Sequence, residues 1–290
     1  MTASKSIVLT AIFCFLCTVQ SIAQTKHSIY LNVLGGYSSF LSDAKGVVAK
    51  GNSGGGLGAG YEFNYNAFVL QCGVEFTYLN ADLQMDNFTI SRDMLDTEGE
   101  LYIGNYDFQN NSDHYRFANV NIPLMLGVNL GRFYFLAGGK LGFNISAQNS
   151  TEATVVSTGT YPQFEDDLHD MPDHYFYSKK ETADFQASLA SSTKNINAYL
   201  SGEAGVNFKA SSKSAVKFRL AVFADYGLLN LRDNNINESA TLDKNSYSPY
   251  LNSFMRSETM RGSFTNNLFA GLRFTVLFGF KEKPDCRCDY

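Results

Sequence analysis

The chain has 290 residues and an acidic balance, with 28 Asp and Glu against 23 Lys and Arg, for a formal net charge of −5 at pH 7. This balance argues against nucleic-acid binding, which requires a basic face. The composition has no Trp but holds 24 Phe, 17 Tyr and 24 Gly, with only 5 Pro. An excess of aromatic residues and glycine suits strands with tight packing and aromatic girdles.

The N-terminus reads as an export signal rather than as part of the fold. Lys5 supplies a positive start, and residues 7–19 form an apolar stretch that is too short to span a bilayer comfortably. The Ser-Ile-Ala sequence at residues 21–23 fits a cleavage site of small residues, which predicts a mature chain that begins at Gln24. No apolar run long enough for a transmembrane helix follows, so we expect none.

The clearest pattern in the mature chain is a pair of alternating segments, residues 115–130 and 133–147, separated by Gly131-Arg132. The first segment places apolar side chains on one face: Ala118, Val120, Ile122, Leu124, Leu126, Val128 and Leu130. Its other face is mixed and partly polar. A period of two predicts strands, and these are longer than the usual five or six residues. Long strands with one apolar face and one small or polar face suit a barrel wall in lipid.

The same alternation recurs along the chain and predicts eight strands. They cover residues 28–37, 55–65, 68–80, 115–130, 133–147, 195–208, 216–228 and 266–280. Long polar stretches at 81–114, 148–193 and 229–262 and a shorter one at 41–54 alternate with short turns. Long loops on one side and short turns on the other are the rule for outer-membrane barrels. We therefore predict an all-β fold, an eight-stranded antiparallel up-and-down transmembrane β-barrel with long extracellular loops and short periplasmic turns.

The predicted organisation has three parts. A signal peptide covers residues 1–23, the outer-membrane barrel domain residues 24–280, and a short polar periplasmic tail residues 281–290. Cys286 and Cys288 lie in this tail, where their spacing gives only a strained disulfide or an incomplete metal site. We assign them no role.

Two short motifs carry a resemblance to a known family. At Asn121-Ile122-Pro123-Leu124 and at Ala137-Gly138-Gly139 the chain resembles the PorT-like outer membrane β-barrel family of Bacteroidetes-type bacteria. The signal ending in Ala23-Gln24 and the last strand ending in Phe278-Gly279-Phe280 are also similar. The resemblance covers about residues 26–280. It implies an integral outer-membrane location and insertion by the barrel assembly machinery, and it places no catalytic residue here. Some members of that family are linked to secretion and motility.

Strand parity predicts that charged side chains point into the barrel. Four acids and four bases share the inner face: Glu62, Glu75, Glu203, Asp225, Lys140, Lys217, Arg219 and Arg273. An eight-stranded barrel is only wide enough for side chains to fill it, and an unpaired buried ion costs several kcal/mol. We expect an ion-pair network that plugs the lumen, with a proton or small-ion path as the alternative. Glycines on the same face leave room for the long side chains.

A segment at residues 165–174 is rich in carboxylates and imidazoles. Its candidate ligands for a divalent cation are Asp166, Asp167, His169, Asp170, Asp173 and His174. Such groups could bind a metal ion or activate water, whereas the plainer interpretation is an acidic surface loop. The glycine-rich run at 51–60 leads into a strand rather than a helix, so it does not fit a phosphate-binding loop.

The sequence therefore predicts a non-enzymatic outer-membrane barrel with no catalytic residue, cofactor or metal centre. We expect a monomer surrounded by outer-membrane lipid, with surface loops that serve binding, adhesion or envelope integrity and whose partner the sequence does not name. One alternative is a secretion or transport accessory barrel or a narrow pore. A second alternative is an outer-membrane hydrolase with its site in the loops.

Overall fold

The computed structural model describes residues 25–96, 99–162, 169–170, 174–177, 196–209, 215–231, 238–242 and 249–280. Its strands are β1 (Thr25–Ser42), β2 (Val47–Tyr65), β3 (Phe68–Met85), β4 (Phe88–Leu95), β5 (Leu101–Leu130), β6 (Phe133–Thr160), β7 (His169–Asp170), β8 (His174–Tyr177), β9 (Ile196–Lys209), β10 (Val216–Gly227), β11 (Ala240–Leu242), β12 (Pro249–Leu251) and β13 (Thr265–Gly279). Two 3₁₀ turns, η2 (Phe254–Arg256) and η3 (Glu258–Met260), precede β13. Within the described residues, no helix has the length and apolar character needed to cross a membrane.

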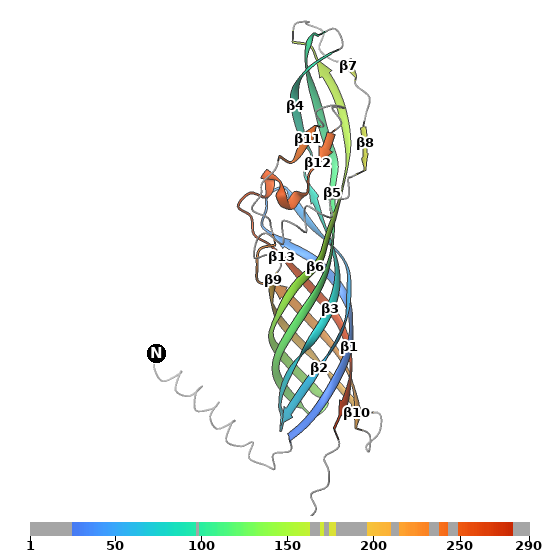
Figure 1. Ribbon diagram of the computed structural model, residues 1–290, viewed down its shortest axis with the longest axis vertical. Coiled ribbons are helices and arrows are strands. Elements are labelled where there is room, and N and C mark those ends of the chain that lie inside the picture. Colours follow the sequence, from blue (N-terminus) through green and yellow to red (C-terminus); the bar gives the residue numbers. More distant parts are fainter. Residues whose placement is uncertain are drawn as a thin grey trace, which may run out of the picture.

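Eight of these strands close into a ring (Figure 1). The order around the ring is β1, β2, β3, β5, β6, β9, β10 and β13, with every neighbouring pair antiparallel. β13 pairs with β1 from Ser28↔Gly279 to Ser42↔Thr265, and this seam completes the closure. The predicted eight-stranded antiparallel barrel is thus confirmed.

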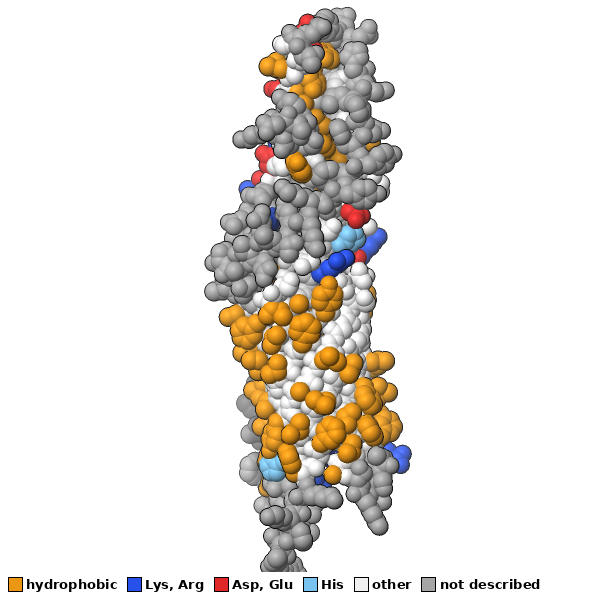
Figure 2. All heavy atoms as spheres, turned by 45° about the vertical axis from the view of Figure 1, so that its right-hand side comes forward, with side chains coloured by type: hydrophobic (Ala, Val, Ile, Leu, Met, Phe, Trp, Pro, Cys, Tyr) orange, Lys and Arg blue, Asp and Glu red, His pale blue; other side chains and the backbone are white. Residues whose placement is uncertain are grey.

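The outer surface of the ring is apolar over a broad band (Figure 2). Val33, Leu124 and Leu272 are each more than half exposed on this surface, with relative exposures of 54%, 58% and 57%. Their neighbours in sequence point inward, and polar residues such as Asn32 and Thr77 are buried in the lumen. The polarity is the reverse of that in a barrel that dissolves in water, where apolar residues fill the inside.

Towards the long-loop end of the barrel the alternation is reversed, so that apolar side chains point inward and polar side chains point outward. Leu83 and Tyr115 point inward there and are buried. Their neighbours Asp82, His114 and Arg116 point outward, and Asp82 pairs with His114 across β3 and β5. Apolar residues inside and polar residues outside are typical of a sheet that faces water. The ring therefore continues beyond the apolar band into an aqueous region.

This change of sign explains why the predicted loops were wrong in extent. β3 runs to Met85, β4 occupies Phe88–Leu95 and β5 begins at Leu101, so most of residues 81–114 is sheet. β6 likewise continues to Thr160. The sequence prediction rests on an apolar outer face, and these segments carry the opposite pattern. The connection after β1 is also shorter than predicted, because β2 already begins at Val47.

β5 and β6 extend past the ring as one long twisted hairpin (Figure 1). β4 pairs with the free edge of β5, from Phe88↔Phe108 to Leu95↔Leu101. β7 and β8 pair with β6 on the other side. These five strands form a single sheet layer. We call this layer, made of β4, the distal halves of β5 and β6, and β7 and β8, the extension.

Candidate functional site

Five charged side chains form a continuous chain across the middle of the lumen. Lys140 Nζ lies 2.8 Å from Glu75 Oε1 and 2.7 Å from Asp225 Oδ2. Arg273 continues the chain, with Nη2 2.8 Å from Glu75 Oε2 and Nη1 2.9 Å from Glu203 Oε2. All five side chains are buried. We call these residues, together with the pair described next, the charge network.

A second ion pair lies nearer the short-turn end of the barrel. Arg219 Nη1 bonds to Glu62 Oε2, and its Nη2 lies 3.0 Å from Glu62 Oε1. The Arg219 Cζ atom is 4.4 Å from the ring centroid of Tyr134, whose hydroxyl donates to Glu203. Tyr134 thereby joins this pair to the central chain. A planar, weakly hydrated guanidinium is suited to such a buried bidentate pair.

Neutral groups also contact the charge network, while the buried Nε of Arg273 has no hydrogen-bond partner among the described residues. Ser201 Oγ donates to Asp225 Oδ1 over 2.6 Å, and the Phe223 ring centroid lies 5.0 Å from Arg273 Cζ. Each of the four carboxylates of the charge network has a cationic partner. Carboxylates that are already bonded in this way offer no open ligand set, so the arrangement fills and fixes the lumen.

The structure brings together seven of the eight charges that parity placed inside. The exception is Lys217, which is half-buried and lines a cavity at the short-turn mouth. The buried part of the set therefore holds four carboxylates and three cations rather than the balanced eight that we expected. Parity identifies which side chains point inward, but it does not say which of them lie near an end of the barrel.

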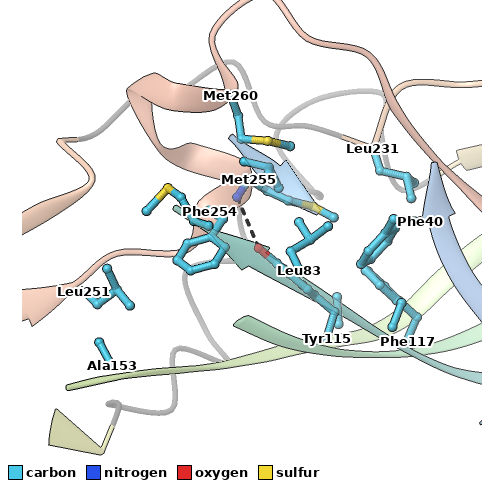
Figure 3. Packing of buried hydrophobic residues seen from close by; sticks show 14 of the residues in the cluster. Phe40, Leu83, Tyr115, Phe117, Ala153, Leu231, Leu251, Phe254, Met255 and Met260 are labelled. Carbon is cyan, nitrogen blue, oxygen red and sulfur yellow. Dashed lines mark hydrogen bonds between the residues drawn. The ribbon is translucent and has the colours of Figure 1, made fainter. Parts of the chain in front are cut away.

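The long-loop mouth is closed by a second, apolar layer (Figure 3). Residues 249–263, which contain β12, η2 and η3, fold inward over this mouth, and we call them the plug. Phe254, Met255 and Met260 of the plug are fully buried in a cluster with Phe40 and Tyr115 of the barrel. The expectation that residues 229–262 form a plain surface loop was therefore wrong for this part of the stretch.

A buried carboxylate anchors the plug. Asp113 Oδ2 accepts the backbone N–H of Phe254 over 2.9 Å and also accepts the hydroxyl of Tyr115. Tyr115 in turn accepts the backbone N–H of Met255 over 3.2 Å, the contact that is dashed in Figure 3. Asn149 Nδ2 lies 3.3 Å from Asp113 Oδ1. Burial raises the pKa of Asp113 to about 6, although these hydrogen bonds oppose the shift.

The proposed ligands of the acidic segment are not brought into a site by the described structure. Asp166, Asp167 and Asp173 lie outside the described residues. His169 and Asp170 form β7 and His174 begins β8, but the side chains of these three residues are not described. Among the side chains that are described, no group of three or more His, Cys, Asp or Glu residues is placed to hold a metal ion. The cation site in this segment stays a prediction.

A comparison with protein families agrees with this architecture. A family model described as "Outer membrane protein beta-barrel domain" matches residues 23–233. No curated protein matches the chain. A similar solved structure is the outer membrane protease OmpT from Escherichia coli, with 7% identity, 90% of this chain and 100% of that chain covered, and a TM-score of 0.31.

Two further structures are similar over most of the chain. The attachment invasion locus protein Ail of Yersinia pestis, solved with the heparin analogue sucrose octasulfate, shows 9% identity, coverage of 87% and 99%, and a TM-score of 0.21. The translocator domain of the autotransporter NalP from Neisseria meningitidis shows 8% identity, coverage of 96% of each chain, and a TM-score of 0.22. At these identities and scores the likenesses say nothing about a shared function.

The charge network predicts a large effect of removing one cation. Lys140→Met leaves Glu75 and Asp225 buried with less compensation, so we expect a loss of about 3–5 kcal/mol in the free energy of unfolding. Urea unfolding in lipid vesicles, followed by the gel shift between folded and heated protein, measures this loss. The exposed Lys50→Met is the matched control and is expected to change stability by no more than about 0.5 kcal/mol.

A double variant separates charge from packing. Lys140→Met combined with Asp225→Asn removes one of the two carboxylates that lose their cation, so it should recover part of the stability. If Lys140→Met were as stable as Lys50→Met, the lumen charges would not be paired as described.

The raised pKa of Asp113 predicts that the plug is held more firmly at acidic pH. The pKa of this carboxyl is raised on folding, so the folded protein keeps a proton that the unfolded chain loses, and stability falls as pH rises from about 4 to about 6. Amide hydrogen exchange at Phe254 and Met255, corrected for the intrinsic rate, should therefore be slower at pH 5 than at pH 7. In Asp113→Asn this difference should vanish, and faster corrected exchange at pH 5 in the unchanged protein would contradict the account.

Proposed function

This chain belongs to the outer membrane protein β-barrel domain family, and from this membership we propose that it is a closed, non-enzymatic scaffold that presents a binding surface outside the cell. Family membership places the barrel in the bacterial outer membrane. By the rule for such barrels, the short turns face the periplasm and the extension faces outward. We propose that the extension serves binding, adhesion or envelope integrity.

The observation that supports this proposal is the length of β5 and β6. They contain 30 and 28 residues, whereas about 9–11 tilted residues are enough to cross a bilayer. At roughly 3.3 Å per residue, more than half of each strand lies beyond the membrane. A chain that only needed to close a barrel would not require this sheet, so we assign the external role to it.

The two closures of the lumen argue against an open pore. The charge network fills the middle of the barrel, and the plug covers the long-loop mouth with buried apolar side chains. A narrow-pore or transport function would require both layers to move. The further assignment to the PorT-like barrels, with its link to secretion, stays a prediction that rests on the motifs around Pro123 and Gly138.

Site-specific photo-crosslinking in living cells tests the proposal. A crosslinking side chain at Thr89, which is exposed on β4 of the extension, should capture a saturable partner of the cell surface or the surrounding medium. The same group at Leu124 on the lipid-facing band is the control and should capture none. If a partner were captured only from Arg132, in the short turn between β5 and β6, the chain would act in the periplasm and the proposal would fail.

A further inference from the structure

We propose that the short-turn mouth of the barrel is a binding site for a phosphate-bearing anion. A cavity of about 940 Å³ opens there, between β1, β2, the β5–β6 turn, β9 and β10. This volume is within the range of small-molecule sites. The cavity is separate from the extension, so this inference does not depend on the proposed external role.

Four side chains at the floor of the cavity belong to a closed ring of five hydrogen-bonded side chains, and the fifth member, Glu62, is buried behind the lining. Arg219 Nε donates to Asn207 Oδ1 over 2.7 Å, and Asn207 Nδ2 lies 3.4 Å from Asn129 Oδ1. Asn129 Nδ2 then donates to Asn64 Oδ1, and Asn64 Nδ2 donates to Glu62 Oε1, each over 2.8 Å. Glu62 closes the ring through its pair with Arg219.

The acceptor oxygens of this ring are all bonded within it. Each of the three amide oxygens accepts a bond from the preceding member, and Glu62, which is 1% exposed, is bonded to Arg219 and Asn64. An Asn amide has two N–H hydrogens, and Asn64 and Asn129 each use one of them in the ring. The floor therefore favours a ligand that accepts hydrogen bonds.

The sides of the cavity add positive charge. Lys26, Arg132 and Lys217 come from three different elements, and no carboxylate is among the described residues that line the cavity. The chain as a whole is acidic, with 28 acids and 23 bases, so this concentration of cations runs against its composition. A recess lined by one sign of charge focuses its field and concentrates ligands of the opposite sign.

These features together select the phosphate class. A phosphate group has several charged acceptor oxygens, which suits a donor floor surrounded by three cations. The rim also includes Phe133 and Phe208, which are 59% and 52% exposed on the lipid-facing side. The cavity thus opens where the membrane surface meets the periplasm, and the phosphate can belong to a soluble compound or to a lipid headgroup.

Two binding measurements on the folded full chain test the site and separate these sources. In the first, inorganic diphosphate is titrated calorimetrically into protein in zwitterionic detergent. In the second, binding of phosphatidylglycerol is compared with that of phosphatidylcholine in nanodiscs. Saturable diphosphate binding that weakens steeply with salt identifies a soluble source, and a preference for phosphatidylglycerol identifies a headgroup.

Matched variants decide whether the binding occurs in this cavity. Arg132→Gln combined with Lys217→Gln should weaken the observed binding at least about tenfold, while Lys45→Gln combined with Lys50→Gln at the opposite end should leave it unchanged. The gel shift on heating confirms that each variant is folded. Absence of binding in both measurements, or equal binding by the two double variants, would overturn the proposal.

Discussion

The structure depends on one constraint, which is that backbone N–H and C=O groups in lipid must be bonded within the protein. A ring of strands meets this constraint only when it closes, and the β1–β13 seam closes it along 15 residue pairs. Closure with eight strands leaves a lumen that side chains can fill. The seven charged side chains that are buried in this lumen are shielded from bulk water, so their pairing follows from the closure of the ring.

The same constraint accounts for the two chemical halves of the molecule. Within the apolar band, β5 shows Val120, Ile122 and Leu124 to the outside. Beyond it, the same strand shows His114 and Arg116 to the outside and buries Tyr115 and Asp113. The backbone is continuous across this point, and only the solvent around it changes. The position where the alternation changes sign therefore marks the edge of the membrane on the strand itself.

The sequence was sufficient to predict the barrel because lipid imposes a simple rule on each strand. An apolar outer face repeated eight times gives strand number, direction and inward parity without any knowledge of contacts. The rule does not apply outside the membrane, which is why β4 and the distal halves of β5 and β6 were predicted as loops. A search that also accepted strands with an apolar inner face would have detected Leu83, Tyr106 and Phe108 as buried positions.

The candidate site was predictable only in part for a related reason. Parity placed Lys140 and Glu75 in the lumen, but their bond joins residues 65 positions apart and depends on the register of the whole ring. The plug could be suspected from Phe254, Met255 and Met260 in a polar stretch, yet its anchor on Asp113 lies 141 positions away from Phe254. The hydrogen-bonded ring at the short-turn mouth has no sequence signal, since its five members come from four different strands.

A spin-label scan along β5 from residue 112 to residue 130 tests this account most directly. Even-numbered positions from 120 onward should be accessible to oxygen dissolved in lipid, and positions 112, 114 and 116 should be accessible to a water-soluble relaxation agent. Odd-numbered positions from 113 to 125 should be accessible to neither, because they face a filled lumen. Access of the water-soluble agent to positions 119, 121 and 125, or a scan without alternation, would contradict a closed barrel sealed by its own side chains.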